Sequence, residues 1–153
     1  MKTKIYKYNI YRIATAKSKL AITSSMAWFA MTPNYGGTTY GKIGAEFSLN
    51  RPIKLFNLGN LENRQQLIKL IERTVTNDNV KLILSPDEQY SGSAQNRTAH
   101  KLIKKALRAS YDGTYICKAN APTTDELAGP SEIVLFSPRG LIKRVKYFEP
   151  IES

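Results

Sequence analysis

Residues 26–41 (MAWFAMTPNYGGTTYG) combine a short apolar run, a Thr-Pro pair and two adjacent glycines. The run at 26–31 is too short for a stable helix and rich in aromatic residues, which predicts a buried strand that Pro33 ends by removing a backbone donor. The glycine pair 36–37 permits positive φ or a close backbone approach, and Tyr40 offers a large flat ring. The pattern fits either the floor of a site for a planar ligand or a plain turn followed by a core tyrosine.

The length and composition are those of one compact domain. The chain has 153 residues, of which 42% are hydrophobic, which suits one core and is too little for two domains of ordinary size. No stretch is apolar over the length of a membrane span, and residues 1–7 lack the apolar segment of a secretory leader. We therefore expect a single domain over residues 1–153 of an intracellular protein, cytoplasmic or nuclear, without a membrane partner.

The cysteine and histidine content argues against disulfide and zinc chemistry. Cys117 is the single cysteine and His100 the single histidine, so neither an internal disulfide nor a zinc cluster can form from these residue types. Cys117 lies in a strand-like segment and is expected to be buried. We expect no metal site.

Basic residues greatly outnumber acidic ones. The chain has 23 Lys and Arg against 12 Asp and Glu, a formal net charge of +11, which attracts polyanions. The excess is concentrated, because residues 1–58 carry nine basic side chains with Glu46 as the only acid, and residues 97–108 carry five with none. A nucleic-acid partner, an anionic cofactor or solubility alone would each account for this charge.

The periodicity of apolar residues predicts an α+β fold. Strand patterns occur at residues 5–14, 26–31, 44–49, 52–58 (half-buried), 80–84, 111–118, 132–136 and 141–148. A weakly helical or irregular segment at 16–25, a polar segment at 85–93 and a loop at 119–130 connect them. The chain shows no regular strand-helix alternation and no G-x-G-x-x-G or P-loop motif, which excludes nucleotide binding by those routes.

Two helices are expected in the middle of the chain. Asn60 is a suitable N-cap for the first, which ends near Thr76, and Ser93 caps the second. The second helix has an apolar stripe that is expected to face the core, made up of Ala99, Leu102, Ile103, Ala106 and Leu107. Its outward face is basic and is made up of Arg97, Lys101, Lys104, Lys105 and Arg108. His100 lies between these faces, where a solvated or hydrogen-bonded structural histidine is expected.

Arg12 occupies an unusual position in the first strand. A period of two puts Tyr6, Tyr8, Ile10 and Arg12 on one face. A guanidinium among bulky apolar residues needs a carboxylate partner or an anionic ligand such as a phosphate. Both interpretations of Arg12 stay open on this pattern.

Glu132 stands at the start of the most apolar strand of the chain, directly after Gly129, Pro130 and Ser131. A carboxylate at such a strand edge loses hydration unless it has a partner or faces a cleft, and burial raises the pKa of a carboxyl group. Raised pKa values are common among catalytic acids and bases. Glu132 is therefore either a catalytic group or a rim residue paired with a lysine.

Three segments together resemble the signatures of the ADP-ribosyltransferase superfamily. YRIA at 11–14 resembles its first motif, WFAMTPNYGGTTYG at 28–41 its second, in which an aromatic-Phe-Ala strand precedes a helix with a tyrosine, and SEIVLF at 131–136 its third. YDGTY at 111–115 followed by EIVLFSPRGLIKRV is also similar to phage- and virus-encoded members. The motifs occur in the order found in the family and span nearly the whole chain.

This resemblance implies a split β-sheet core with two main helices and a cleft that binds NAD⁺ without a Rossmann fold. Glu132 takes the place of the catalytic glutamate, which holds the ribose and stabilises positive charge as nicotinamide leaves. Tyr40 would stack on the nicotinamide ring, and Arg12 would hold the diphosphate or the adenosine ribose. Phe29 and Ala30 occupy the cofactor-binding aromatic-Phe-Ala strand, with Thr15 and Trp28 as neighbours of the site.

Departures from the family patterns narrow the expected reaction. Pro130 replaces the Gln or Glu of arginine-modifying members, Ala30 replaces a serine, and Arg12 stands where polymerases carry a histidine. The resemblance therefore implies a mono-ADP-ribosyltransferase, a glycosyltransferase that passes one ADP-ribose to a protein or nucleic-acid acceptor, or an NAD⁺ hydrolase. It implies no metal.

Two other functions remain open. A non-catalytic nucleic-acid-binding domain on the same scaffold would use residues 97–108 with Tyr6, Tyr8 and Tyr11 as its contact surface. An RNA 2′-phosphotransferase would need several arginines and a histidine, of which Arg12 alone is well placed.

Overall fold

The computed structural model describes residues 3–23, 25–33, 37–71, 94–117 and 131–151, together with Thr76, Asp78 and Val80. The strands are β1 (Thr3–Tyr6), β2 (Ile10–Ala14), β3 (Ala27–Ala30), β4 (Ile43–Leu49), β5 (Ile53–Asn57), β6 (Gly113–Cys117), β7 (Ser131–Leu135) and β8 (Ile142–Phe148). The helices are α1 (Leu61–Ile71) and α4 (Ala94–Leu107), and the short 3-10 helices are η1 (Lys17–Leu20), η2 (Gly37–Tyr40) and η3 (Pro138–Gly140). The prediction of an α+β fold is confirmed.

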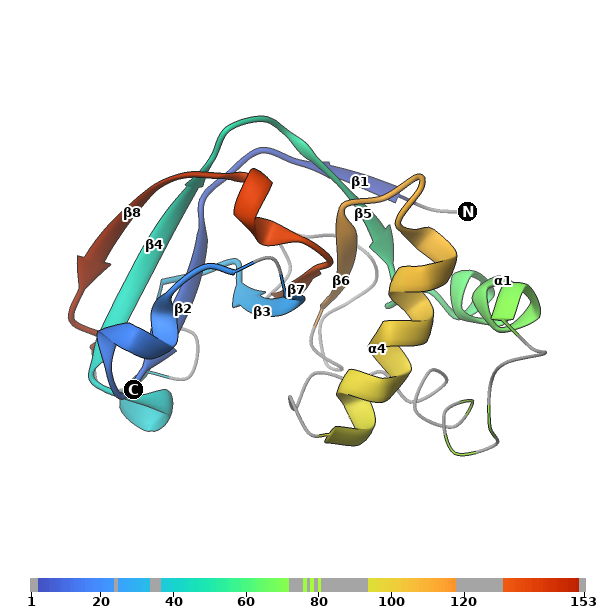
Figure 1. Ribbon diagram of the computed structural model, residues 1–153, viewed down its shortest axis with the longest axis horizontal. Coiled ribbons are helices and arrows are strands. Elements are labelled where there is room, and N and C mark those ends of the chain that lie inside the picture. The colour runs from blue at the N-terminus through green and yellow to red at the C-terminus, as the bar shows by residue number, and fades with distance from the viewer. Residues whose placement is uncertain are drawn as a thin grey trace.

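The eight strands form one curled sheet in the order β1-β5-β6-β7-β3-β2-β4-β8 (Figure 1). β5 and β6 are parallel, and the other neighbours are antiparallel. β2 and β3 share a single register pair, Tyr11 with Ala30, whereas β3 has four pairs with β7 and β2 has five with β4. The sheet is therefore weakly joined between a large half, β1-β5-β6-β7-β3, and a small half, β2-β4-β8.

Among the described strands the chain crosses between the halves five times, and the connections from β1 to β2, from β4 to β5 and from β7 to β8 are the short ones. The expected single strand at 5–14 is thus two strands, because β1 pairs with β5 and β2 with β4. Tyr8 lies in the break and is 64% exposed, while Tyr6 and Ile10 are buried. The strand does not continue through residues 7–9, and the exposed Tyr8 ring packs edge-on against the Tyr6 ring, at 5.7 Å between ring centres.

Two apolar cores lie on opposite sides of the large half. The first contains side chains from both halves, among them Phe29, Phe47, Leu55 and Ile133. The second joins the large half to α1 and α4, which lie beside β5 and β6 (Figure 1), and contains Phe56, Phe136, Leu67, Ile71, Ile103 and Leu107. Successive residues of one strand point to opposite faces, so the two cores explain why Leu55 and Phe56, which follow one another in β5, are both apolar and buried.

The strand predicted at 52–58 is more buried than expected. Ile53 and Leu55 belong to the first core and Phe56 and Leu58 to the second, and all four are fully buried. The expectation of a half-buried strand was wrong because the two helices cover the face that would otherwise meet solvent.

The helices follow their sequence signals in the described residues. The Asn60 side chain accepts a hydrogen bond from the backbone N–H of Asn63 at 2.9 Å, which confirms the predicted N-cap. In α4, Ala99, Ile103 and Leu107 are buried as predicted. His100 is also fully buried, so the solvated alternative for this residue was wrong. None of the helices described is long and apolar enough to cross a membrane.

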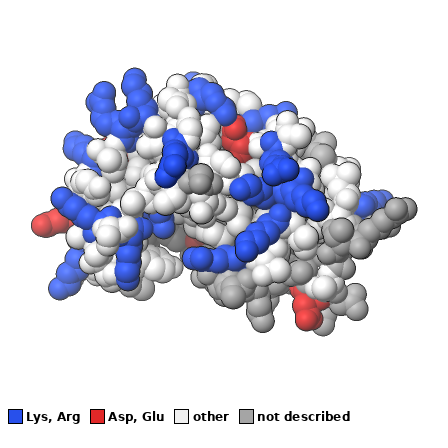
Figure 2. Space-filling model, in the orientation of Figure 1, with Lys and Arg blue, Asp and Glu red and all other residues white. Residues whose placement is uncertain are grey.

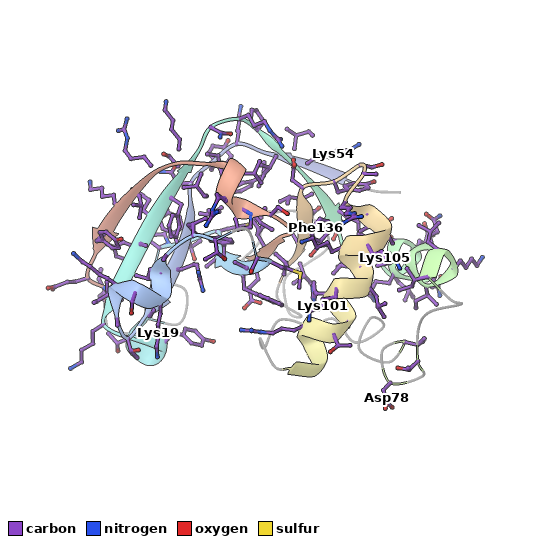
Figure 3. All side chains as sticks on the ribbon, in the orientation of Figure 1. Lys19, Lys54, Asp78, Lys101, Lys105 and Phe136 are labelled. Atoms are coloured by element: carbon purple, nitrogen blue, oxygen red, sulfur yellow. The ribbon has the colours of Figure 1, made fainter. Side chains whose placement is uncertain are left out.

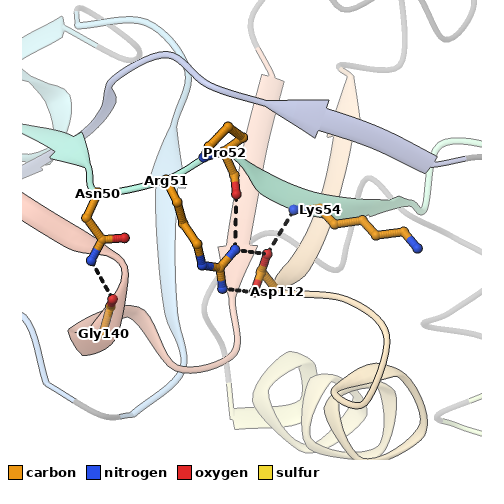
Figure 4. A network of polar contacts seen from close by, with 6 residues as sticks. All are labelled: Asn50, Arg51, Pro52, Lys54, Asp112 and Gly140. Carbon is orange, nitrogen blue, oxygen red and sulfur yellow. Dashed lines mark hydrogen bonds and ion pairs between the residues drawn. The ribbon is translucent and has the colours of Figure 1, made fainter.

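An ion pair ties the β4-β5 connection to the start of β6 (Figure 4). Arg51 donates two hydrogen bonds to the carboxylate of Asp112, at 2.9 and 2.8 Å, and the backbone N–H of Lys54 donates a third at 2.9 Å. The backbone N–H of Asp112 in turn donates to the carbonyl of Lys54. Asp112 thus holds β5 and β6 side by side at their first residues.

Several predictions fall outside the described residues. They concern the cap at Ser93, the loops 85–93 and 119–130, Gly36, Pro130, residues 81–84 of the strand expected at 80–84, residues 72–75 of the first helix, and the Cys117 side chain.

Candidate functional site

A cavity of about 460 Å³ lies where the two halves of the sheet meet. Its wall is formed by β2, β3 and the turn after β3, together with Tyr40 of η2, Glu132 of β7 and Arg97 of α4. Because β2 and β3 share one register pair and then separate, their side chains line a space that continuous pairing would have closed. The volume falls within the range of small-molecule sites, about 300 to 1,000 Å³.

Glu132 lines this cavity from β7 and is half-buried. In the sheet it lies between Ala30 of β3 and Ile116 of β6. Ala30 also lines the cavity, and its small side chain leaves space beside the carboxylate. The strand that sequence periodicity predicted therefore carries Glu132 to the cavity wall.

Arg12 lines the cavity from β2, in register with Ala45 of β4. Its guanidinium lies 5.6 Å from the centre of the Phe29 ring, a cation–π distance. Burial first, and then the nearby charge of Arg97, lower the pKa of Arg12. Both effects disfavour the positive charge, so an anion in the cavity would relieve them.

Arg97 also lines the cavity, although the sequence did not predict it as a site residue. It was expected on the outward face of the second helix, and it is exposed, but it also lines the cavity from the first turn of α4. Its guanidinium lies 5.8 Å from the centre of the Trp28 ring. In the described part of the chain, neither Arg97 nor Arg12 forms an ion pair with a carboxylate. No sequence signal separates Arg97 from the other basic residues of α4.

The aromatic residues of β3 hold this wall in place from both faces. Phe29 packs edge-on against Phe47 of the first core, at 5.6 Å between ring centres. Trp28 points the other way and packs edge-on against His100, at 5.4 Å. Both line the cavity, so Trp28 is part of the site rather than a neighbour of it.

Tyr40 reaches the cavity from η2 and is 56% exposed. The next residue, Gly41, has φ +145°, and a Cβ there would overlap the backbone of Ala14 and Thr15 at the end of β2. This close approach keeps η2 against β2. Of the predicted glycine pair, Gly37 is the first residue of η2, and the close backbone approach that the structure shows here is made by Gly41.

The tyrosines proposed as a nucleic-acid surface are not together on the outside. Tyr6 is buried in the first core. Tyr11 is half-buried, lines the cavity and packs against Phe148 at 6.3 Å between ring centres. Tyr8 alone of the three is exposed, so a shared contact surface of these side chains was wrong.

The cavity thus brings together Arg12, Phe29, Ala30, Tyr40 and Glu132 from four separate elements. Thr15 is not among the residues that line it. Comparison of the chain with protein-family models, with curated proteins and with solved structures found no match in any of the three. A functional assignment therefore depends on the residues of the cavity itself.

The described residues show no group of three or more His, Cys, Asp and Glu side chains that could hold a metal ion. Among the described residues, the polar groups of the cavity wall include two guanidiniums, one carboxylate, the indole N–H of Trp28 and the hydroxyls of Tyr11, Thr32 and Tyr40. Such a set suits an anionic organic ligand with a polar sugar or base.

Proposed function

We propose that this protein is a mono-ADP-ribosyltransferase with a split-sheet core like that of the superfamily it resembles. The reaction breaks the bond between the nicotinamide nitrogen and the ribose of NAD⁺ and passes ADP-ribose to an acceptor. The observation that carries the proposal is the convergence on one cavity of all five residues that the resemblance assigns to the site. Chance resemblance of three short segments would not require their residues to meet.

Glu132 would supply the electrostatic part of catalysis. Positive charge develops on the ribose as nicotinamide departs, and a fixed carboxylate beside that carbon stabilises the charge. Glu132 is half-buried on a strand paired on both sides, so it is held in position. Apolar walls from Phe29, Trp28 and Ile13 reduce screening by water and strengthen its effect.

Arg12 and Arg97 would hold the diphosphate of NAD⁺. A guanidinium donates paired hydrogen bonds to phosphate oxygens, and both groups reach the cavity without a carboxylate partner in the described residues. The exposed ring of Tyr40 would stack on the nicotinamide. Transfer of a single ADP-ribose agrees with the arginine at position 12, where the polymerases carry a histidine.

Replacing Glu132 by Gln tests the proposal. We expect Glu132→Gln to lower the rate of nicotinamide release from NAD⁺ by about 10²- to 10³-fold, the usual effect of removing one transition-state electrostatic contact. The variant should keep its circular dichroism spectrum and still bind NAD⁺. Nicotinamide is followed chromatographically, with and without cell extract, DNA or RNA.

Glu149→Gln is the matched control, because Glu149 is an exposed carboxylate outside the cavity. Its rate should equal that of the wild type. Equal nicotinamide release by wild type and Glu132→Gln would refute the catalytic role of Glu132, and no release by wild type under any condition would refute the proposed activity.

A further inference from the structure

A line of basic residues leads away from the cavity along α4. Arg97, Lys101 and Lys105 follow one another at intervals of four residues, which places them on one helix face about 6 Å apart along the axis. All three are exposed, and Arg97 lines the cavity. Lys101 and Lys105 extend from successive turns of α4 in Figure 3. Lys104 and Arg108 of the same segment are also basic. We name these five residues together the α4 track: Arg97, Lys101, Lys104, Lys105 and Arg108.

The charge of the α4 track is not balanced within the described structure. α4 contains no acidic residue, whereas α1 carries Glu62 as well as Lys69. Like charges four residues apart repel and destabilise a helix. None of the track residues forms an ion pair in the parts of the chain described. Figure 2 shows Lys and Arg side chains over α4 and also over the small half of the sheet. The basic residues of α4 differ from those of the small half because Arg97 continues their row into the cavity.

A single nucleic-acid strand fits this surface better than a membrane does. A regular row of cations can follow the phosphates of a flexible strand and release their counterions. A helix that binds a bilayer inserts an apolar face between the lipids. The apolar face of α4 packs in the protein interior, since Ala99, Ile103 and Leu107 are buried.

We propose that the α4 track binds the backbone of a single-stranded nucleic acid and directs one nucleotide into the cavity as the acceptor of ADP-ribose, an inference that rests on the proposed function. The bond from the ribose carbon to nicotinamide breaks, and its electrons leave with nicotinamide. A nucleophilic oxygen or nitrogen of the nucleotide then bonds to that carbon, and its proton passes to water.

The test compares two double variants that each lose two lysines. Lys101→Gln/Lys105→Gln removes charge from the α4 track and retains a good helix former. Lys19→Gln/Lys143→Gln removes the same charge from η1 and β8 in the small half, where both side chains are exposed. Figure 3 shows Lys19 far from Lys101 and Lys105.

Binding is measured first, in a Glu132→Gln background, with fluorescein-labelled 20-nucleotide RNA and DNA strands over a series of salt concentrations. Loss of two phosphate contacts should reduce the slope of log affinity against log salt by about 1.4 and weaken binding at low salt by about tenfold or more. The small-half variant should retain the wild-type slope. Equal weakening by both variants, or preferential binding of vesicles containing phosphatidylserine, would overturn the proposal.

Transfer is measured next, with otherwise wild-type proteins, NAD⁺ labelled in its adenylate phosphate and the same strands. The α4 variant should place about tenfold less label on the strand, with unchanged nicotinamide release when no strand is present. Label on protein or in free ADP-ribose only would overturn the nucleic-acid acceptor and leave the proposed transferase standing. Track-dependent binding without any consumption of NAD⁺ would instead refute the transferase, and with it the acceptor role.

Discussion

Arg12 shows how one residue can be costly to the fold and useful to a site. Its guanidinium is half-buried, rests on Phe29 and has the like charge of Arg97 nearby. The sequence left open whether Arg12 belongs to a structural ion pair or to a ligand site. In the described residues it makes no ion pair, which favours the ligand.

Arg12→Met separates these two roles. Met keeps an apolar stem over Phe29 and removes a desolvated charge, so we expect the free energy of unfolding of the ligand-free protein to stay equal or rise by about 1 kcal/mol. NAD⁺ affinity should fall by about ten- to a hundredfold, the value of a charge-assisted phosphate contact. Urea unfolding and calorimetric titration in a Glu132→Gln background measure the two effects.

Arg51→Met provides the contrast for this prediction. Arg51 forms a two-point ion pair with Asp112 away from the cavity, so its loss should lower stability by about 1 kcal/mol and leave NAD⁺ affinity unchanged. A clear loss of stability in Arg12→Met with normal NAD⁺ binding would show that Arg12 is structural.

At the scale of elements, the site depends on how η2 is held against the end of β2. Gly41 has positive φ and lies against the backbone of Ala14 and Thr15. Tyr40 precedes it in η2 and lines the cavity. The position of the Tyr40 ring is therefore set by a glycine outside the apolar core.

Gly41→Ala should disturb both stability and ligand binding. A Cβ at this position is strained by the backbone conformation and also overlaps β2, so we expect a loss of about 1 to 3 kcal/mol in the free energy of unfolding. The displaced Tyr40 should raise the KM for NAD⁺ several-fold. Gly140→Ala is the control, because nothing lies within 4 Å of a Cβ built there, and its stability should change by less than about 0.5 kcal/mol. Equal effects of the two substitutions would contradict the role given to Gly41.

At the scale of the whole molecule, the short connections between strands of the two halves compensate for the weak β2-β3 junction. The connection from β4 to β5 carries Arg51, which reaches across to Asp112 at the start of β6. The hydrogen bond from Arg51 lowers the pKa of Asp112 below its ordinary value of 3.8. A carboxylate with a lowered pKa in the folded state stabilises the fold above its unfolded pKa, and this contribution is lost as the pH falls through the folded value.

Asp112→Asn should therefore reveal a pH-dependent part of the stability. Near pH 7 the variant should be less stable than the wild type by about 1 kcal/mol, and the difference should shrink as the pH falls below about 4. Asn50→Ala is the control, since it removes the hydrogen bond from the Asn50 amide to the Gly140 carbonyl and no group that titrates. Urea unfolding between pH 7 and pH 3 measures both. A difference for Asp112→Asn that does not vary with pH would contradict the ion-pair explanation.

Predictions that depend on neighbouring residues in the chain succeeded. Alternation and aromatic content predicted β3, β4 and β7, and the Asn60 cap and the apolar stripe of α4 were confirmed. Local patterns did not settle the exposure of side chains where a distant element decides it. His100 is buried because Trp28 packs on it, and Tyr8 is exposed because the strand changes partners beside it.

The sequence by itself determined the α+β content, the basic charge and the residues that carry the family-like motifs, because these follow from side-chain type and short-range spacing. The tertiary structure alone decided that Arg12, Tyr40 and Glu132 line one cavity with Arg97. That cavity depends on the order of the strands and on the early separation of β2 from β3. Both are outcomes of pairing and packing between residues far apart in the chain, which no local pattern records.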